Sequence, residues 1–222
     1  MLGLDVLTIS SLLVMTAGNT VHCTVPKPPA ISVNPTSREV EYNFRENAKA
    51  LGSRKNDTVS PYEPGSDTTT GGLRHDQPQT SLQISWGVVQ YPDLGVACLY
   101  YDSVAINIEL SPTIYVAKEY LDKKECKSAI LEHERRHVRV DRKIINKYAL
   151  KIGQSVKQSI DEMGAIGPIR VEDIETTQKQ LIEHVKNAAT AHDFEISEDM
   201  RRLQEQVDSI EEYKRISAIC NK

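Results

Sequence analysis

The sequence predicts an α+β domain, because its apolar residues repeat with two different periods in two regions. From Leu82 to Val116, apolar residues alternate with small or polar ones, as in half-buried strands. After Tyr120 they recur at steps of three and four, as in amphipathic helices. The strand-like runs are joined by connections too short for helical crossovers. We therefore expect a small, largely antiparallel sheet packed on a long helix, with a helical C-terminal cap.

The first 23 residues are typical of an export segment. An apolar stretch from Val6 to Ala17 has the length of a secretory hydrophobic region, although Asp5 stands where a positive charge is usual. A buried strand or helix is the alternative. His22 is too large for the position before a lipidated cysteine, so no lipid anchor is expected at Cys23. These features predict a secreted or periplasmic protein.

The remaining chain, residues 39–222, is long enough for one domain. Residues 24–38 contain four prolines and no helical periodicity, which predicts an extended lead-in without a site. Residues 39–51 begin with alternating apolar residues and could form a strand running into a short helix. Residues 52–81 are rich in Gly, Ser, Thr, Asp and Pro, which predicts a long loop.

The predicted sheet occupies residues 82–116. Alternation begins at Leu82, and Pro112 restricts one strand to an edge or ends it. The further strand-like runs are VACLYY at 96–101, VAINIEL at 104–110 and TIYV at 113–116.

Helical periodicity predicts a helix at 122–151, which Gly153 could kink or end. Two further amphipathic helices are predicted within 171–219, at about 171–191 and 197–219.

The four cysteines allow three fully paired connectivities in an oxidising compartment. If Cys23 is removed or stays free, one bridge among Cys98, Cys126 and Cys220 is expected. Buried free thiols are the alternative.

The composition argues against nucleic acid and membrane as partners. Lys and Arg total 27 against 31 Asp and Glu, a net charge of −4. No apolar run approaches the roughly 20 residues of a membrane span. Basic residues along the predicted long helix are interleaved with acidic ones and lack an aromatic platform, which favours a solvated face. They are Arg135, Arg136, Arg139, Arg142, Lys143 and Lys147.

The candidate site is the sequence His-Glu-Arg-Arg-His at 133–137, inside the predicted long helix. Four residues advance a helix by about 400°, so His133 and His137 project from the same face one turn apart. Both lie on the apolar stripe of the helix. This spacing lets two imidazoles share one tetrahedral Zn²⁺.

Glu134 lies one residue further round the helix. From there its carboxylate could accept a proton from a metal-bound water and later deliver it to a leaving amine, as a general base and then acid. Two alternatives remain. The helix could be a solvated, charged one with an ion pair from Glu132 to Arg136, or the histidines could be satisfied core residues.

The motif at 133–137, preceded by the strand-like run at 104–110, resembles the active-site helix and edge strand of the zincin metallopeptidases. The resemblance implies a zinc-dependent enzyme that hydrolyses peptide bonds in a peptide or protein substrate, with His133 and His137 as ligands and Glu134 as the catalytic carboxylate.

The wider layout looks like an uncharacterised bacterial family described as secreted zinc-dependent proteases, from about Val40 to Asp208. Its members pair an exported N-terminus with a histidine helix and a helical tail. This chain departs from zincins at Arg135 and Arg136, where uncharged residues are usual. The family's C-terminal Tyr-Asp segment is matched only by Val207-Asp208.

A zinc hydrolase needs a third protein ligand and an open fourth position. The metzincin pattern would require His or Asp where this chain has Lys143. Asp141 lies about 12 Å from His133 along the helix axis, at about 1.5 Å per residue, which is too far to close the same site. We expect Asp141 to contact a ligand rather than the metal, orienting His137, or to pair with an arginine, or else to form an ordinary surface salt bridge.

The third ligand is therefore expected from the C-terminal helices, folded back over the long helix. Asp208 is favoured because it matches the Asp of the resembled family, and Glu205 comes next. His184 and His192 are alternative ligands or oxyanion donors, and Tyr213 could donate in the same way. The carboxylates considered are Glu162, Glu172, Glu175, Glu205, Asp208 and Glu211.

The sequence thus predicts a zincin-like, zinc-dependent metallopeptidase. The rival hypothesis is a non-catalytic envelope or interaction domain, whose histidine helix is structural or binds metal without turnover.

Overall fold

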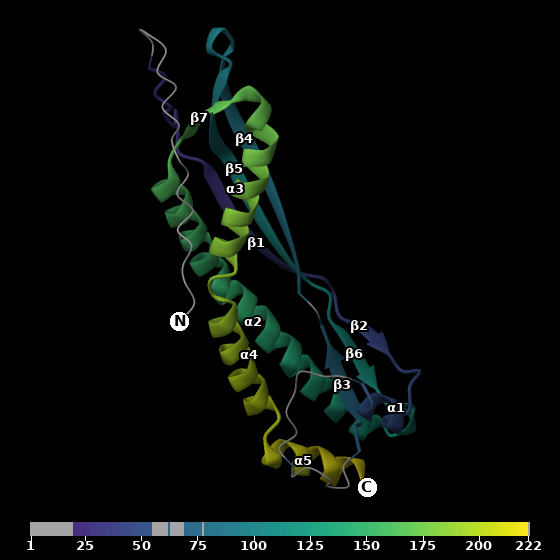
Figure 1. Ribbon diagram of the computed structural model, residues 1–222. Helices are drawn as coiled ribbons and strands as arrows, with labels where there is room; N and C mark the ends of the chain where they lie inside the picture. The colour runs from purple at the N-terminus through teal and green to yellow at the C-terminus, as the bar shows by residue number, and fades with distance from the viewer. Residues whose placement is uncertain (1–19, 55–61, 63–68, 77, 222) are drawn as a thin grey trace, which may run out of the picture.

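The computed structural model describes residues 20–54, 62, 69–76 and 78–221. Of the predicted export segment, residues 1–23, the first 19 lie outside the described residues. The molecule is elongated, with one long helix, α2 (Lys124–Met163), running along most of it (Figure 1). A sheet packs at each end of this helix, and further helices run back along it. The α+β class predicted from the sequence is confirmed.

The larger sheet contains β1 (Ala30–Ser37), β4 (Gln79–Tyr91), β5 (Val96–Leu110) and β7 (Ile166–Arg170). The central strand β5 pairs in parallel with β1 and antiparallel with β4. Its first residues also pair antiparallel with β7.

The smaller sheet contains β2 (Glu41–Asn43), β3 (Gly72–His75) and β6 (Thr113–Val116), in the order β2-β6-β3. β2 is parallel to β6, and β3 is antiparallel to it. Residues 82–116, predicted as one sheet, are thus divided between two. Each sheet also contains one parallel pair of strands, β1 with β5 and β2 with β6. The short connections within 82–116 could not predict these pairs, because β1 and β2 lie far from their partners in the chain.

Two segments predicted without regular structure contain strands. The lead-in at 24–38 includes β1, whose Ile31 and Val33 pack against the core. The loop predicted at 52–81 includes β3, whose Leu73 is buried, and the beginning of β4. In both, pairing with a neighbouring strand supplies the backbone hydrogen bonds that local sequence did not indicate.

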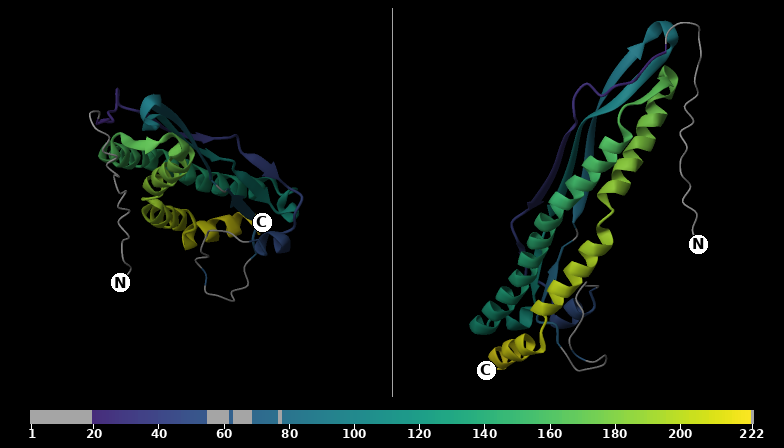
Figure 2. Two further views of the ribbon diagram at one scale, coloured as in Figure 1. Left: turned by 45° about the horizontal axis from the view of Figure 1, so that its top comes forward. Right: turned by 90° about the vertical axis from the view of Figure 1, so that its left-hand side faces the viewer.

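The helices after α2 are α3 (Ile174–Ala189), α4 (Asp193–Val207) and α5 (Ile210–Cys220), three where two were predicted. Figure 2 shows α3 and α4 running back alongside α2, while α5 turns across its beginning. The shorter helices are α1 (Ala48–Gly52) and the 3₁₀ turns η1 (Pro92–Leu94), η2 (Lys118–Tyr120) and η3 (Val171–Asp173).

α2 extends twelve residues beyond the predicted end at 151, because its apolar stripe continues through Ile152, Val156 and Ile160. These residues belong to a core cluster that joins α2 to β5 and α3. The helix passes through Gly153 and ends before Gly164, whose φ of 65° lies in the left-handed region that favours glycine.

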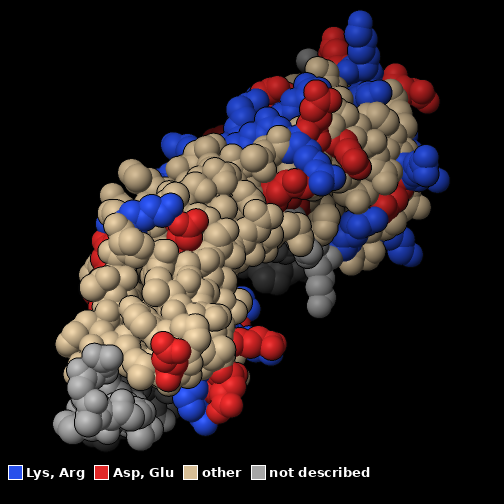
Figure 3. Space-filling view, turned by 90° about the horizontal axis from the view of Figure 1, so that it is seen from above, with Lys and Arg blue, Asp and Glu red and all other residues tan. Residues whose placement is uncertain are grey.

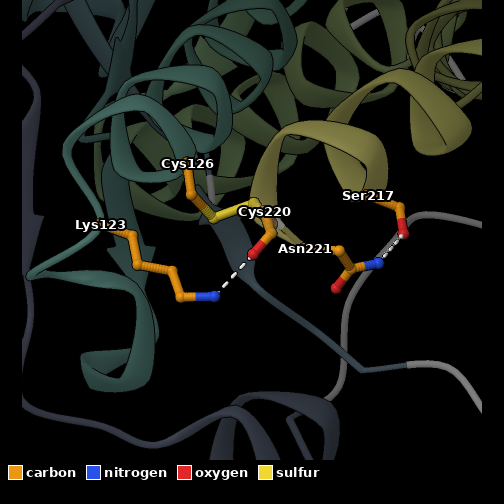
Figure 4. The surroundings of a disulfide bond; sticks show 5 residues. All are labelled: Lys123, Cys126, Ser217, Cys220 and Asn221. Carbon is orange, nitrogen blue, oxygen red and sulfur yellow. Dashed lines mark hydrogen bonds between the residues drawn. A yellow bond between two sulfur atoms is a disulfide. The ribbon is translucent and has the colours of Figure 1, made fainter.

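All four cysteines are paired, Cys23 with Cys98 and Cys126 with Cys220. Cys23 is therefore neither free nor available to carry a lipid, and the expected single bridge is corrected to two. The second bridge joins the first turn of α2 to the end of α5, where the Lys123 Nζ also donates to the Cys220 carbonyl at 2.7 Å (Figure 4). Two disulfides are consistent with an extracellular or periplasmic protein.

None of the helices in the described part of the chain is long and apolar enough to cross a membrane. In the view of Figure 3, Lys and Arg side chains lie among Asp and Glu side chains rather than in a patch of one sign.

Candidate metal centre

The centre begins with two histidines on the buried stripe of α2. His133 and His137 are one turn apart, and their ring centroids are 4.8 Å apart with the planes near perpendicular. Neighbours on the same stripe, Ile130 and Ile144, belong to the core. The sequence therefore brings both imidazoles inward because they replace apolar residues in the helical repeat.

Asp208 approaches from the opposite side, at the corner between α4 and α5. It is the C-cap residue of α4. Ser209 is the N-cap of α5 and accepts a hydrogen bond from the Glu212 backbone N–H at 3.3 Å. Ser209 and Glu212 have the spacing of a capping box, so the sequence itself indicates that a new helix begins at this corner. The corner points a short carboxylate at α2.

The donor atoms of the three residues form a nearly equilateral triangle. The Nε2 atoms of His133 and His137 are 3.2 Å apart, and Asp208 Oδ1 lies 3.2 Å from the first and 3.1 Å from the second. All three residues are buried, with exposed fractions of 6%, 2% and 3%. They form a group that could hold a metal ion.

The spacing fits Zn²⁺. Ligand atoms about 2.0–2.1 Å from a tetrahedral centre lie about 3.3–3.4 Å from one another, close to the three separations observed. Two imidazole nitrogens and one carboxylate oxygen are also ligands that zinc accepts. The other oxygen of Asp208 is buried and has no hydrogen-bond partner among the described residues, so it too is available to a cation.

The electrostatics of Asp208 favour its charged form. Burial alone would raise the pKa of this carboxyl group, but its interactions with the rings of His133 and His137 hold the pKa well below the usual range. The centre therefore presents one negative charge to a cation.

Glu134 lies between this group and β3, and it is 5% exposed. The backbone N–H of Arg74 donates to its carboxylate. Burial raises the pKa of Glu134 to about 7, opposed by the charge of His137. The close approach depends on Gly72, because a Cβ there would lie 2.6 Å from Glu134 Oε1.

His137 is held from behind by Gln204 of α4, which the sequence did not single out. The His137 Nδ1 lies 2.5 Å from Gln204 Oε1, and Gln204 Nε2 donates to Asp141 Oδ1 at 2.6 Å. Asp141 also forms a buried ion pair with Arg74 at 3.3 Å. Asp141 thus acts on His137 through Gln204 and pairs with an arginine from β3, so it is not a surface residue. Burial raises the pKa of Asp141 to about 6.

His133 is flanked on its outer side by two charged groups. Its Nδ1 lies 3.6 Å from Glu212 Oε1 and 3.4 Å from Arg136 Nη2. Glu212 also forms an ion pair with Arg136, so the pair predicted between Glu132 and Arg136 does not form. Glu132 binds Arg139 instead. Arg136 therefore lies on the outer side of His133, where it holds α5 against α2. The Nε of Arg135 donates to the Tyr42 hydroxyl at 3.1 Å.

Tyr213 covers the centre from α5. Its hydroxyl donates to Asp208 Oδ1 at 3.1 Å, and its ring meets the His133 ring edge-on at 5.7 Å. Burial raises the pKa of the Tyr213 hydroxyl, and the Asp208 charge raises it further, so the group stays protonated and donates. The Tyr62 ring also meets the Tyr213 ring edge-on, with centroids 5.7 Å apart.

The other candidate residues lie elsewhere. His184 bonds to Ser159, and His192 bonds to Ser155, both between helices along α2. Glu205 is exposed and paired with Arg201. The remaining carboxylates considered as ligands are exposed on the molecular surface; they are Glu162, Glu172, Glu175 and Glu211.

No family model matches the chain, and no curated protein or solved structure matches it either.

Proposed function

We propose that the protein is a zinc-dependent hydrolase that cleaves peptide bonds in a peptide or protein substrate. The observation that carries the proposal is the triangle of donor atoms from His133, His137 and Asp208 beside a buried carboxylate, Glu134. Three protein ligands leave a fourth position open, which is the composition of catalytic zinc sites rather than structural ones. The peptide as substrate follows from the resemblance of the histidine motif to zincins.

Zinc bound at this centre would supply Lewis acidity to a substrate carbonyl and lower the pKa of water. Glu134 carries the proton: its carboxylate accepts one from the attacking water and returns it to the leaving amine nitrogen. The backbone N–H of Arg74 fixes the orientation of this carboxylate by donating a hydrogen bond to it. The single proton of the Tyr213 hydroxyl is donated to Asp208 Oδ1, so Tyr213 could stabilise negative charge on the carbonyl oxygen only by leaving that carboxylate.

One observation favours the rival function, a metal site without turnover. The four central residues are at most 6% exposed, and Tyr213 lies over them. A centre covered in this way gives a substrate no direct access, which a metal site without turnover does not need. Hydrolysis of a polypeptide therefore requires α5 to move aside, whereas a structural site does not.

We also propose that the chain is exported. The apolar stretch before Ala17 supports this, as does the pairing of Cys23, which lies just after that stretch, in a disulfide.

The experiment measures zinc content and peptidase activity of the purified full chain. We expect one zinc per chain, lost in His133→Ala and retained in His192→Ala, which removes a histidine outside the centre. Glu134→Gln should retain zinc and lower kcat by about 10²–10⁴-fold, because the amide cannot carry the proton. The variant is nearly isosteric, so the loss would not reflect altered packing.

Zinc at full occupancy with no cleavage of a denatured protein library, in either wild type or Glu134→Gln, would favour the structural site. Absence of stoichiometric zinc from the wild type would contradict both the hydrolase and the metal site without turnover, and would favour an interaction domain whose histidine helix is structural. Equal activity in wild type and Glu134→Gln would remove Glu134 from the mechanism.

A further inference from the structure

A buried chain of polar side chains connects His137 to the guanidinium of Arg74 on the smaller sheet. The order is His137, Gln204, Asp141 and Arg74, drawn from α2, α4, α2 and β3. The Asp141 and Arg74 side chains are only 3% and 6% exposed, and Gln204 is 3% exposed. Because these groups are shielded from water, each hydrogen bond must be made by the protein itself.

The orientation of the Gln204 amide in this chain is fixed by two acceptors. Its Nε2 donates to the Asp141 carboxylate at 2.6 Å and also faces the backbone carbonyl of His137 at 3.3 Å. Neither an ionised carboxylate nor a carbonyl can donate a hydrogen bond. The amide nitrogen must therefore point to them, and the amide oxygen must point to His137.

The amide oxygen in turn fixes the proton of His137. Oxygen Oε1 can only accept, and it lies 2.5 Å from Nδ1, so Nδ1 must carry a hydrogen. In the neutral ring the other nitrogen, Nε2, then has a free lone pair. That nitrogen is the one in the triangle with His133 and Asp208.

Asp208 pulls the proton in the opposite direction. Its Oδ1 lies 3.1 Å from His137 Nε2, and a carboxylate favours a proton on the nitrogen that faces it. With Asp208 alone, a neutral His137 would hold its proton on Nε2 and be closed to a metal. Gln204 is the group that opposes this tautomer.

We propose that Gln204 is a positioning residue that holds neutral His137 in the Nδ1–H tautomer, ready to bind a metal through Nε2. Arg74 and Asp141 act through Gln204 by fixing the direction of its amide. The metal-binding consequence rests on the proposed function, whereas the tautomer belongs to the chain alone.

His133 provides the contrast. Its outer nitrogen faces an acceptor, Glu212 Oε1 at 3.6 Å, and a donor, Arg136 Nη2 at 3.4 Å. One acceptor and one donor at similar distances do not oppose Asp208 Oδ1, which lies 3.2 Å from His133 Nε2 and favours a proton there. Glu212→Gln is therefore the matched control, because it alters the neighbours of His133 and leaves those of His137 unchanged.

The test is a nitrogen-15 NMR spectrum of the histidine side chains in the full, metal-free chain, recorded at alkaline pH where the rings are neutral. Absence of the His137 signals from His137→Gln assigns them. We expect the proton on Nδ1 in wild type and in Glu212→Gln. In Gln204→Met, which keeps the length of the side chain but lacks the acceptor, the proton should shift towards Nε2. Gln204→Glu, which restores an acceptor, should return it to Nδ1.

Zinc affinity of the same variants, measured by competition with a chromophoric chelator, gives the second measurement. Gln204→Met should bind zinc about 10–100-fold more weakly than wild type, as is usual when the partner of a ligating histidine is lost. Gln204→Glu should recover part of this loss.

A wild-type His137 with its proton on Nε2 would overturn the inference, and this result needs no variant to fold. An unchanged tautomer in Gln204→Met would also overturn it. If wild type shows the Nδ1 proton but binds no zinc, the tautomer inference holds while the proposed function fails. If zinc binds and the tautomer does not depend on Gln204, the proposed function is supported while the tautomer inference fails.

Discussion

Asp208 reaches both imidazoles because the backbone turns at that residue. As a side chain within a continuous helix it would project along one face of α4, whereas at the corner before Ser209 it faces α2. The single oxygen Oδ1 contacts the Nε2 atoms of both His133 and His137. The negative charge of the centre thus depends on one residue.

If the proposed function holds, Asp208→Asn should weaken zinc binding by more than the roughly 10–100-fold loss that is typical when the hydrogen-bond partner of a ligand is removed. The amide is neutral and is not among the usual ligands of zinc. Competition with a chromophoric chelator measures the affinity. Asp193→Asn, which makes the same change at an exposed position in the first turn of α4, is the control. A loss of the same size in both variants would contradict the role of Asp208.

At the residue scale, one motif of the sequence contains three residues of the centre, and the others lie far away in the chain. His133, Glu134 and His137 are recognisable because their spacing fits a single helical face. Asp208 lies 71 residues from His137 along the chain, and only a family resemblance selected it. Gln204 and Arg74 could not be predicted, because each acquires its role from a partner on another element.

At the scale of elements, the close contact between β3 and α2 places Glu134. A Cβ at Gly72 would lie 2.4 Å from Ile130 Cγ2 and 2.6 Å from Glu134 Oε1. Ile130 belongs to the core and cannot move freely. The strand can therefore approach the helix only with glycine at this position.

Gly72→Ala should lower the free energy of unfolding by about 1–3 kcal/mol, the usual cost of overpacking. If the proposed function holds, peptidase activity should fall as well, because β3 must shift away from Glu134. Chemical denaturation measures the first effect. Gly153→Ala is the opposite case: its Cβ would meet Val33 Cγ2 at an ordinary 3.4 Å inside α2. There we expect a gain of up to about 1 kcal/mol from helix propensity. Equal effects at the two positions would refute the crowding argument.

The sequence predicted most elements and missed how some of them continue. VACLYY and VAINIEL were separate runs because the buried face changes from odd to even positions between Tyr101 and Val104. In the structure they form one strand, β5, with a bulge: Ser85 pairs with Ser103 and Trp86 with Tyr101. An extra residue reverses the alternation without ending the strand, so periodicity alone could not join the two runs.

At the scale of the molecule, α5 is held over the centre by one interaction near each of its ends. The beginning of α5 is held by the ion pair of Glu212 with Arg136, and its end by the disulfide of Cys220 with Cys126. Tyr213 lies between these fastenings. The other disulfide, from Cys23 to Cys98, lies where β5 pairs with β7, and Figure 1 places those strands at the opposite end of the molecule from α5.

This arrangement could not be derived from the sequence, because four cysteines allow three pairings and only the path of the chain selects one. The consequence of the pairing is also spatial. Cys126 lies seven residues before His133 in α2, and Cys220 lies seven residues after Tyr213 in α5. One bridge therefore fixes a pair of helices that both contribute to the candidate metal centre, and the other does not.

Replacing both cysteines of either bridge by serine should destabilise the chain by a similar amount, about 2–5 kcal/mol. The two bridges close loops of comparable length, with sequence separations of 94 and 75 residues. Only the variant lacking Cys126–Cys220 should also bind zinc more weakly, because α5 then loses one of its two fastenings and Tyr213 its fixed hydrogen bond to Asp208. Thermal unfolding gives the first quantity, and zinc titration well below the unfolding temperature of both variants gives the second. If the two double variants bind zinc equally well, the bridge in α5 serves the stability of the fold alone and the metal centre does not depend on it.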